Sequence, residues 1–223
     1  MPDRDYRLAD GTRVPGCTTI IGRFKESGGL IHWAWKLGTE GKDYRRERDK
    51  AAAAGTLAHT MIEYYIDCKE KPDLEDLRVF CEDIRIGEKE YELAEGGFSA
   101  FMDWVGFMNV EFVETEVKLI SEEYRFGGTP DAIARRDGEL MLLDWKTSNG
   151  IYPDYLVQLA AYVHLWESNR DEPIRNVHLL RFGKQYGDFH HHSWPLAVFD
   201  VAFELFTHYR VAFDLAKEVK RAV

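Results

Sequence analysis

Three charged residues away from the turn interrupt a stretch that otherwise has the pattern of a buried β-hairpin. The stretch is GGTPDAIARRDGELMLLDWKTS, residues 127–148, and the three residues are Asp131, Asp144 and Lys146. Carboxylates and a lysine are costly to bury unless they are paired or bind a metal ion. Their presence in an apolar hairpin therefore suggests a chemical role.

The expected turn of the hairpin determines which residues face each other. Asp137-Gly138 is a strong signal for a two-residue turn between antiparallel strands. With that turn, Asp131 faces Asp144, and their Cβ atoms lie ~5 Å apart on one face of the sheet. A three-residue loop would instead place Asp131 opposite Leu143 and break the pairing. Two opposed carboxylates repel each other, and a bound divalent cation would compensate.

Strand alternation adds the lysine to the same face. Because successive side chains point to opposite faces, Lys146 lies on the face of Asp144 and Trp145 turns to the other. Residues 140–143, which precede Asp144 on the same strand, are apolar and are expected to be buried. We therefore expect two carboxylates and one lysine to converge at one end of the sheet.

This set suits metal-assisted hydrolysis of a phosphodiester. Two carboxylates bind a hard cation such as Mg²⁺ or Mn²⁺, which polarises the phosphate and lowers the pKa of a bound water. The lysine orients that water or offsets charge that develops on the phosphate. The alternative is a surface aspartate, an aspartate at a strand end and a lysine that extends to solvent.

The surrounding pattern predicts an α/β fold with a mixed central sheet flanked by helices and with an N-terminal helical portion. The N-terminal part is expected to contain a strand pair around Asp10-Gly11, a helix near residues 30–38, a helix over about 43–70, and further helices over 73–109 that are broken near Gly96-Gly97. A strand over 110–121 and the hairpin are expected next, followed by a helix over 152–168 with Asp154 near its start. Two strands around 175–183 and 189–196 and an amphipathic helix over about 196–222, which packs over the sheet, complete the expected elements. We expect a single domain over residues 1–223, with a helical portion at about 28–110, a catalytic sheet core at about 111–195 and a C-terminal helix at about 196–223.

Composition narrows the class of protein. With 223 residues and 45% hydrophobic content, the chain is long enough for one well-filled core. The net charge of −10 argues mildly against a protein that coats nucleic acid nonspecifically, but it does not exclude a local nucleic-acid groove. The charged N-terminus and the absence of a long apolar run lead us to expect a soluble cytoplasmic protein of a bacterial or phage-infected cell. Cys17, Cys68 and Cys81 lack metal-site spacing and are expected to be reduced.

The motifs together resemble the PD-(D/E)XK nuclease superfamily. GGTPD followed by DWK is similar to the family's central motif, and DWKTS…QLAAY resembles its RecB-type exonuclease branch. GTLAH, with Gly55 and His59, matches the Gly-x-x-x-His of an upstream helix in that branch. CTTIIGRF before a Trp-containing helix, and Glu116 fifteen residues before Asp131, are similar to the mitochondrial genome-maintenance exonuclease type and to phage exonucleases.

The resemblance implies a restriction-endonuclease-like fold and a role for each matching residue. The implied metal ligands are His59, Asp131, Asp144 and the backbone carbonyl of Trp145, with Glu116 as a further site carboxylate. Lys146 would be the catalytic lysine. Gln158 and Tyr162 would organise the site and contact DNA. Gln158 and Tyr162 lie one helical turn apart and so share a helix face. Glu114, with the same parity on the strand, is an alternative to Glu116. The imidazole ligand adds some preference for Mn²⁺ over Mg²⁺.

Several of these residues also have a structural interpretation. His59 could be a satisfied core histidine, and Glu63, one turn later, could orient its ring or lie exposed on the helix. Thr147 and Ser148 could bind a phosphate or end the strand. For Tyr152 and Tyr155, base stacking is an option, but packing in the core or at its rim is the safer interpretation. In His190-His191-His192 the strand alternation turns His191 away from its neighbours, so we interpret the run as a polar strand.

We therefore expect a metal-dependent deoxyribonuclease using Mg²⁺ or Mn²⁺, most consistent with an exonuclease on single-stranded DNA or DNA ends in DNA processing, repair or recombination. A helical segment at about 28–66 that arches over the strand would admit only a free end. The alternatives are a structure-specific endonuclease of the same fold and a noncatalytic DNA-end-binding module. Expected partners are DNA and recombination or replication proteins. The sequence has neither the four cysteines of the iron–sulfur relatives nor an ATP-binding phosphate loop, so we expect no iron–sulfur cluster, no ATP use and no membrane association.

Overall fold

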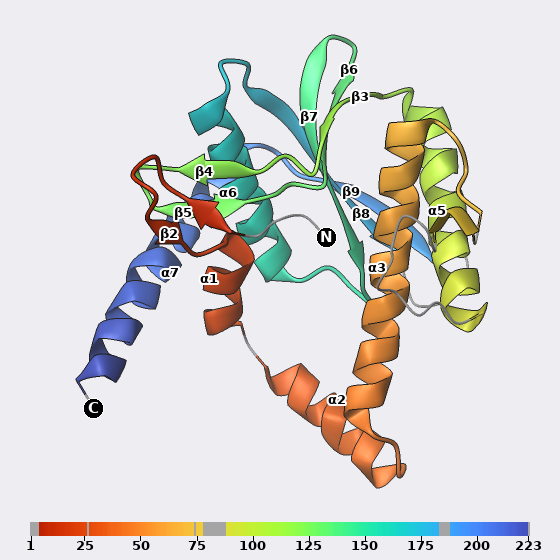
Figure 1. Cartoon of the computed structure of the whole chain (residues 1–223), viewed down its shortest axis with the longest axis horizontal. Helices are drawn as coiled ribbons and strands as arrows, with labels where there is room; N and C mark the ends of the chain where they lie inside the picture. Colours follow the sequence, from red (N-terminus) through yellow and green to blue (C-terminus); the bar gives the residue numbers. More distant parts are fainter. Residues whose placement is uncertain (1–4, 26, 74, 78–87, 183–187, 223) are drawn as a thin grey trace.

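A mixed β-sheet lies at the centre of the protein (Figure 1). The structure is a computed structural model that describes residues 5–25, 27–73, 75–77, 88–182 and 188–222. Within these residues the central sheet has the strand order β3-β6-β7-β8-β9, and β7 and β8 pair in parallel while the other neighbours pair antiparallel. The strands are β3 (Glu111–Thr115), β6 (Ala132–Arg136), β7 (Glu139–Thr147), β8 (Ile174–Phe182) and β9 (Phe189–Ser193). The expected mixed sheet is confirmed.

The β6–β7 hairpin has the two-residue turn that its sequence predicts. Asp137 and Gly138 have φ values of +52° and +85°, the left-handed conformation that both central residues of a type I′ turn require. The register places Ala132 opposite Leu143. One step further along this register lie the two aspartates, so the three-residue loop is excluded.

The connection from β7 to β8 places a helix over the end of β7. Because β7 and β8 are parallel, the chain must cross over between them, and it does so through α6 (Pro153–Asn169). Asp154 lies in the first turn of α6, as expected, where a negative charge is favourable. Since α6 begins shortly after β7 ends, its first turns lie close to Asp144 and Lys146.

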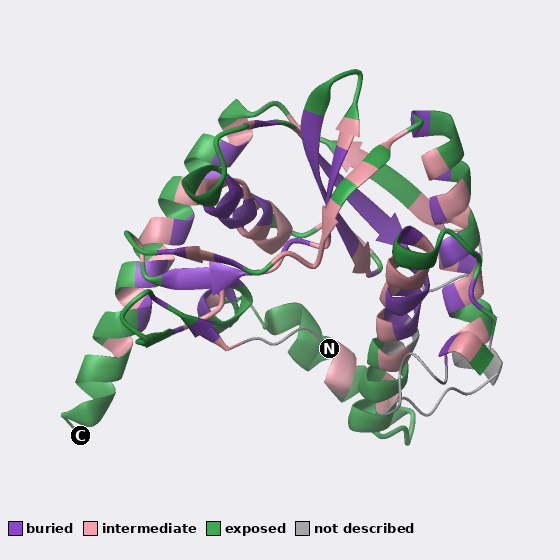
Figure 2. Cartoon of the chain, turned by 45° about the horizontal axis from the view of Figure 1, so that its top comes forward, coloured by how far each residue is buried: buried purple, intermediate pink, exposed green. Residues whose placement is uncertain are grey.

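Helices cover both faces of the sheet (Figure 1). One face carries the α6 layer, which consists of α1 (Cys17–Phe24), α6 and α7 (Ala197–Arg221). The other face carries the α3 layer, which consists of α3 (Tyr44–Cys68) and α5 (Glu88–Met108). Leu140 and Leu142 pack in the α6 layer, whereas Leu143 and Trp145 pack in the α3 layer. The predicted turn of Trp145 away from Asp144 is therefore confirmed, and Figure 2 shows that β7 is buried along most of its length.

The N-terminal part begins with the expected strand pair, β1 (Tyr6–Arg7) and β2 (Arg13–Val14). The next element, α1, is a helix that the sequence pattern did not assign. It is followed by α2 (Gly28–Thr39), which buries none of its side chains and links α1 to the start of α3 (Figures 1 and 2). α3 begins after Asp43, whose side chain accepts a hydrogen bond from the backbone of Arg45 at 2.9 Å.

Three expectations about the elements are wrong. Residues 110–121 do not form one strand, because the chain leaves β3 at Glu116, with φ +47°, and forms β4 (Leu119–Ser121), which pairs with β5 (Phe126–Gly128) in a separate sheet. α5 runs unbroken through Gly96-Gly97, because the helix packs closely on the Phe182 side chain at Gly97. α7 packs against α6 and α1, which separate much of it from the sheet.

The remaining elements follow the sequence pattern. β8 and β9 are present, and His191 of β9 contacts His178 while His190 and His192 stack on each other with centroids 6.0 Å apart. The polar-strand interpretation of the histidine run is thus confirmed. Cys17 and Cys68 are free thiols, and Cys81 lies outside the described residues. None of the described helices is long and apolar enough to cross a membrane.

Candidate active site

The carboxyl end of β7 brings the two aspartates and the lysine together. Lys146 Nζ lies 2.5 Å from Asp144 Oδ2, and the Trp145 backbone N–H donates a hydrogen bond of 2.8 Å to Asp131 Oδ2. This bond joins the side chain of Asp131 to the backbone of β7. The three groups therefore occupy one place at the end of the hairpin, as the register predicted.

Burial controls the protonation of these groups. Asp144 is 1% exposed, and its burial raises its pKa to about 7, with a contribution from Asp131 and opposition from Lys146. Burial also raises the pKa of Asp131. Burial lowers the pKa of Lys146, but the two carboxylates outweigh it and the net shift is upward. The lysine thus stays charged and supplies the positive charge that the aspartates need.

The paired glycines of the GGTPD motif allow close packing before Asp131. A Cβ atom on Gly127 would lie 2.3 Å from the ring of Tyr6, and one on Gly128 would lie 2.7 Å from Leu165 and 2.8 Å from Tyr162. A real side chain cannot occupy such positions without displacing these neighbours. The glycines therefore let β5 lie against β1 and α6, which fixes where Asp131 emerges.

α6 contributes a hydrogen-bonded pair to the same face. Gln158 Nε2 donates to the Tyr162 hydroxyl at 2.7 Å, as expected for residues one helical turn apart. Tyr162 is buried, and burial raises its pKa well above the usual value, with further contributions from Cys17, Asp144 and Asp131. The Tyr162 hydroxyl is therefore held neutral beside the carboxylates.

α3 approaches the end of β7 from the opposite face. A Cβ atom on Gly55 would lie 3.1 Å from Thr147 Cβ, so the glycine lets α3 pack tightly on the strand end. One turn later, the His59 ring lies edge-on to the ring of Trp145, with centroids 6.2 Å apart. Burial and the charge of Lys146 lower the pKa of His59 to about 4, against a hydrogen bond to the Trp145 backbone. His59 is therefore neutral at pH 7, the state that a metal-binding imidazole requires.

Glu63 is electrostatically coupled to the site. Its side chain is partly buried, and burial and Asp67 raise its pKa. Glu63 in turn contributes to the raised pKa of Asp131. Glu63 is therefore not an ordinary exposed helix residue, and its role in orienting the His59 ring stays a prediction.

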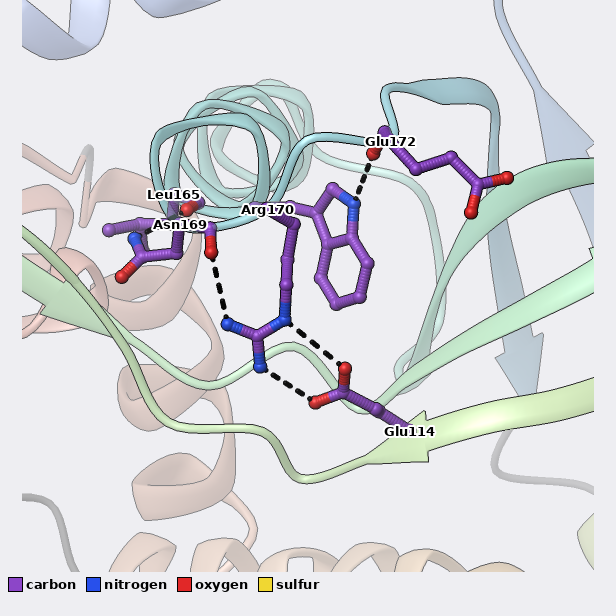
Figure 3. Close-up of polar contacts among 6 residues, drawn as sticks. Glu114, Leu165, Asn169, Arg170 and Glu172 are labelled. Atoms are coloured by element: carbon purple, nitrogen blue, oxygen red, sulfur yellow. Dashed lines mark hydrogen bonds and ion pairs between the residues drawn. The ribbon is translucent and has the colours of Figure 1, made fainter.

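The two glutamates of the β3 end differ in their surroundings. Glu114 forms an ion pair with Arg170 from the end of α6, with contacts of 3.1 and 3.3 Å (Figure 3). The Glu116 backbone N–H donates a hydrogen bond of 3.1 Å to the carbonyl of Asp131. The ion pair directs the Glu114 side chain toward Arg170, whereas the Glu116 backbone is joined to that of Asp131, so Glu116 remains the candidate site carboxylate.

Thr147 and Ser148, which follow Lys146, differ in whether their hydroxyl groups have a hydrogen-bond partner. The Ser148 hydroxyl donates to the carbonyl of Gly150 at 2.8 Å, and its backbone N–H donates to Phe182 at 3.0 Å, so Ser148 helps to end the strand. Thr147 Oγ1 is buried and has no hydrogen-bond partner among the described residues. Thr147 is the one of the two that has an unused hydroxyl.

The donor set is suited to a hard divalent cation. Asp131 and Asp144 present carboxylate oxygens on one face, and the buried Asp144 Oδ2 receives no well-directed hydrogen bond among the described residues despite its short contact with Lys146. The described residues contain no group of three or more His, Cys, Asp or Glu side chains close enough to hold a metal. Asp131 and Asp144 are therefore the candidate metal-binding pair, and ligation by His59 or Glu116 would require these side chains to move closer.

One residue beside Tyr152 and Tyr155, Lys25, was not identified from the sequence. Lys25 follows α1 and lies 3.3 Å from Asp154, with its Nζ 5.7 Å from the ring centroid of Tyr152 and 6.0 Å from that of Tyr155. No local pattern connects Lys25 with residues this far along the chain. Tyr155 is partly buried, as expected at the rim of the core, whereas Tyr152 is 44% exposed.

Comparisons with known proteins bear on the family and the fold of the chain. The sequence model of the PD-(D/E)XK nuclease superfamily matches residues 31–192. A putative exonuclease from Eubacterium rectale has a similar fold, with a TM-score of 0.53 and 15% identity over 70% of this chain and 64% of that chain. An alkaline exonuclease from Laribacter hongkongensis gives a TM-score of 0.35 and 14% identity, covering 71% of this chain and 91% of that one. No curated protein matches the chain.

These similarities carry different weight. At 15% identity the Eubacterium protein shows a shared fold, and this chain spans 64% of its length. The family model covers most of the chain and includes the α3, β6, β7 and α6 segments that form the site. The chain therefore belongs to the PD-(D/E)XK nuclease superfamily.

Proposed function

We propose that the protein is a metal-dependent deoxyribonuclease. Within this class we propose an exonuclease that acts on single-stranded DNA or on DNA ends. The observation that carries the proposal is the completeness of the charged set at the end of β7. Asp131, Asp144 and Lys146 share one face, and Lys146 Nζ contacts Asp144 at 2.5 Å. A noncatalytic member of the fold would have no need to keep all three groups in this costly buried arrangement.

In the proposed reaction, Asp131 and Asp144 would hold Mg²⁺ or Mn²⁺ together with the Trp145 carbonyl, and His59 and Glu116 would be additional ligands once their side chains move closer. The cation supplies Lewis-acid activation of water and of the phosphate. Asp131 is oriented by its hydrogen bond from the Trp145 N–H, and Asp144 by its contact with Lys146.

Lys146 has two tasks in this proposal. Its ammonium group offsets the negative charge of the aspartates before substrate binds, and it stabilises the charge that develops on the phosphate during hydrolysis. Because the two carboxylates raise its pKa, the lysine acts as a cation and not as a general base.

The groups around this centre would position the DNA. Gln158 and Tyr162 form a fixed polar pair on the α6 side, and the Gln158 amide retains hydrogen-bonding capacity for a phosphate or sugar oxygen. The hydroxyl of Thr147 has no partner among the described residues but is buried beside Gly55, so it would donate to a phosphate only if the strand end moved, whereas Ser148 would contribute mainly to ending the strand. Glu63 would act through Asp131, since their charges are coupled.

The test is hydrolysis of end-labelled linear and circular single-stranded DNA with Mg²⁺, Mn²⁺ or EDTA, by the wild type and by Lys146→Ala. Metal-dependent loss of the linear substrate alone, abolished in the variant, is the expected result. Cleavage of the circle would replace the exonuclease with an endonuclease of the same chemistry. DNA binding without lysine-dependent cleavage of either substrate would overturn the catalytic proposal in favour of a binding module.

A further inference from the structure

Two tyrosines extend outward from Lys146 to the surface. The Lys146 ammonium lies 5.7 Å from the ring centroid of Tyr155. The Tyr155 ring meets the Tyr152 ring edge-on, with centroids 5.5 Å apart and an interplanar angle of 87°. Tyr155 is partly buried, whereas Tyr152 is 44% exposed. Lys146 and Tyr155 are both partly buried, so Tyr152 is the exposed end of this series.

Lys25 holds the two rings from the α1 side. Its ammonium group lies 5.7 Å from the Tyr152 centroid and 6.0 Å from the Tyr155 centroid, within the range of cation–π attraction. An ion pair of 3.3 Å with Asp154 fixes the lysine in this position. Tyr152 is therefore an exposed aromatic ring with contacts to a second ring and to a cation, which limit its orientation.

An exposed aromatic ring beside a phosphate-cleaving centre suits a nucleobase. Proteins that hold single strands stack successive bases on aromatic side chains, and this contact tolerates any sequence because every base has a π-face. A Tyr ring with two χ angles and fixed neighbours loses little conformational entropy on binding. The position of Tyr152, one ring away from Lys146, matches a base close to the phosphate that would be cleaved.

We propose that Tyr152 stacks on the base of a nucleotide adjacent to the scissile phosphate, with Tyr155 and Lys25 fixing its ring. This inference rests on the proposed nuclease function and adds to it a substrate-positioning residue. It commits the site to an unpaired base, because a base within a duplex has its faces covered by its neighbours. The substrate class is accordingly single-stranded DNA or a frayed end.

The experiment changes residue 152 of the protein and the terminal bases of the substrate, separately and together. Steady-state kinetics are measured for the wild type, Tyr152→Ala and Tyr152→Phe on a linear single-stranded oligonucleotide and on a matched one that carries abasic residues at both ends. Phe107→Ala is the matched control, since Phe107 is an aromatic residue on α5 that is 82% exposed. Both oligonucleotides are also titrated by fluorescence anisotropy in EDTA.

The expected result is specific to the base. Tyr152→Ala lowers kcat/KM on the normal substrate by about 5- to 150-fold, mainly through KM, as loss of one stacking contact predicts. Tyr152→Phe stays close to the wild type because it keeps the ring, and Phe107→Ala is unchanged. On the abasic substrate the wild type and Tyr152→Ala become equal.

Two results overturn the inference. Tyr152→Ala could leave kcat/KM unchanged, or it could lower kcat/KM equally on both substrates, which would indicate a structural role. If the wild type does not cleave DNA at all, the proposed function fails on its own, and anisotropy decides the inference. Stacking would then be supported if the wild type binds the normal oligonucleotide more tightly than the abasic one and Tyr152→Ala does not. Equal binding of the two oligonucleotides by the wild type would overturn the inference.

Discussion

The two helical layers reach the same strand end in different ways. The α6 layer contributes side chains to the face of Asp144, namely the hydrogen-bonded pair Gln158–Tyr162 and the ring of Tyr155 against Lys146. The α3 layer contacts the strand mainly through Gly55 at Thr147 and through His59 at Trp145. The α6 layer therefore surrounds the charged groups with polar and aromatic side chains, and the α3 layer packs on the strand that carries them and brings His59 to its end.

This difference explains why the site lies at an end of the sheet. On the flat faces of the sheet, the central strands are covered by apolar side chains of both layers. At the carboxyl end of β7, Asp144 has Lys146 of the same strand as its cationic partner, and polar side chains of α6 and α3 lie nearby. The layers also differ in how their residues would affect activity when changed.

The largest effect is expected from Lys146→Ala, which removes the cation that both layers surround. We expect kcat to fall by about 10³-fold, the order found when one group that stabilises transition-state charge is lost. The measurement is single-turnover hydrolysis of linear DNA at saturating metal, together with a thermal melt. Lys220→Ala, at the end of α7, is the control, and a residual rate within about tenfold of the wild type would contradict the role of Lys146.

A smaller effect is expected on the α6 side from Tyr162→Phe. The change keeps the ring but removes the hydroxyl that accepts the Gln158 hydrogen bond. We expect a fall in kcat/KM of about tenfold and a loss of about 1 kcal/mol in the free energy of unfolding. Tyr209→Phe on α7 is the matched control, since its ring stacks on Phe24. Equal kinetics for the two variants would show that the hydroxyl has no role in the site.

On the α3 side, Gly55→Ala separates activity from stability. The new methyl group would lie 3.1 Å from Thr147 Cβ, so α3 or the strand end must shift by a few tenths of an ångström. Alanine favours the helix by about 0.5–1 kcal/mol over glycine, which offsets much of the strain. We expect kcat to fall by several-fold with little change in the free energy of unfolding.

The control for this change is Gly106→Ala in α5, where the methyl group meets no atom within 4 Å. That variant should be as active as the wild type and slightly more stable. Full activity in Gly55→Ala would show that the close approach of α3 to Thr147 is not needed for the reaction.

The smallest effect on activity and a clear effect on stability are expected from His178, which lies under α5. Burial, His191 and Arg136 lower the pKa of His178 to about 4. Since the folded pKa lies below the unfolded value of 6.5, the unfolded chain takes up a proton first as the pH falls. The stabilisation is present above pH 6.5 and is lost progressively between pH 6.5 and pH 4.

The pH effect can be isolated with His178→Gln, which does not titrate. The wild type should lose about 2 kcal/mol more than the variant between pH 7 and pH 5. Denaturant unfolding at the two pH values measures this difference, and groups such as Asp144 cancel because both proteins contain them. A parallel pH dependence of the two proteins would show that His178 is not held neutral.

The sequence predicted the hairpin better than the elements around it. The Asp137-Gly138 turn is a local signal, and it fixes the register that brings Asp131 to Asp144 without any knowledge of the rest of the fold. The spacing of Gln158 and Tyr162 is likewise local, because it depends only on the helix period. Residues whose positions depend on local geometry were therefore predictable.

Features that depend on distant packing were not predictable from the pattern. The chain bends at Glu116 because β4 pairs with β5, so one apparent strand serves two sheets. Gly96-Gly97 suggests a helix break, but packing on Phe182 keeps α5 continuous. Lys25 reaches Tyr152 and Asp154 only through the packing of α1 against α6. Each of these results from contacts between segments far apart in the chain.

The most direct test of the account is Mn²⁺ binding to the wild type, Asp131→Asn and Asp144→Asn, measured by titration calorimetry without DNA. Because both carboxylates are proposed to hold the cation, we predict that the wild type binds Mn²⁺ and that each variant raises the Kd by at least about tenfold while remaining folded. Unchanged Mn²⁺ affinity in both variants would contradict the assignment of the metal site to the end of β7.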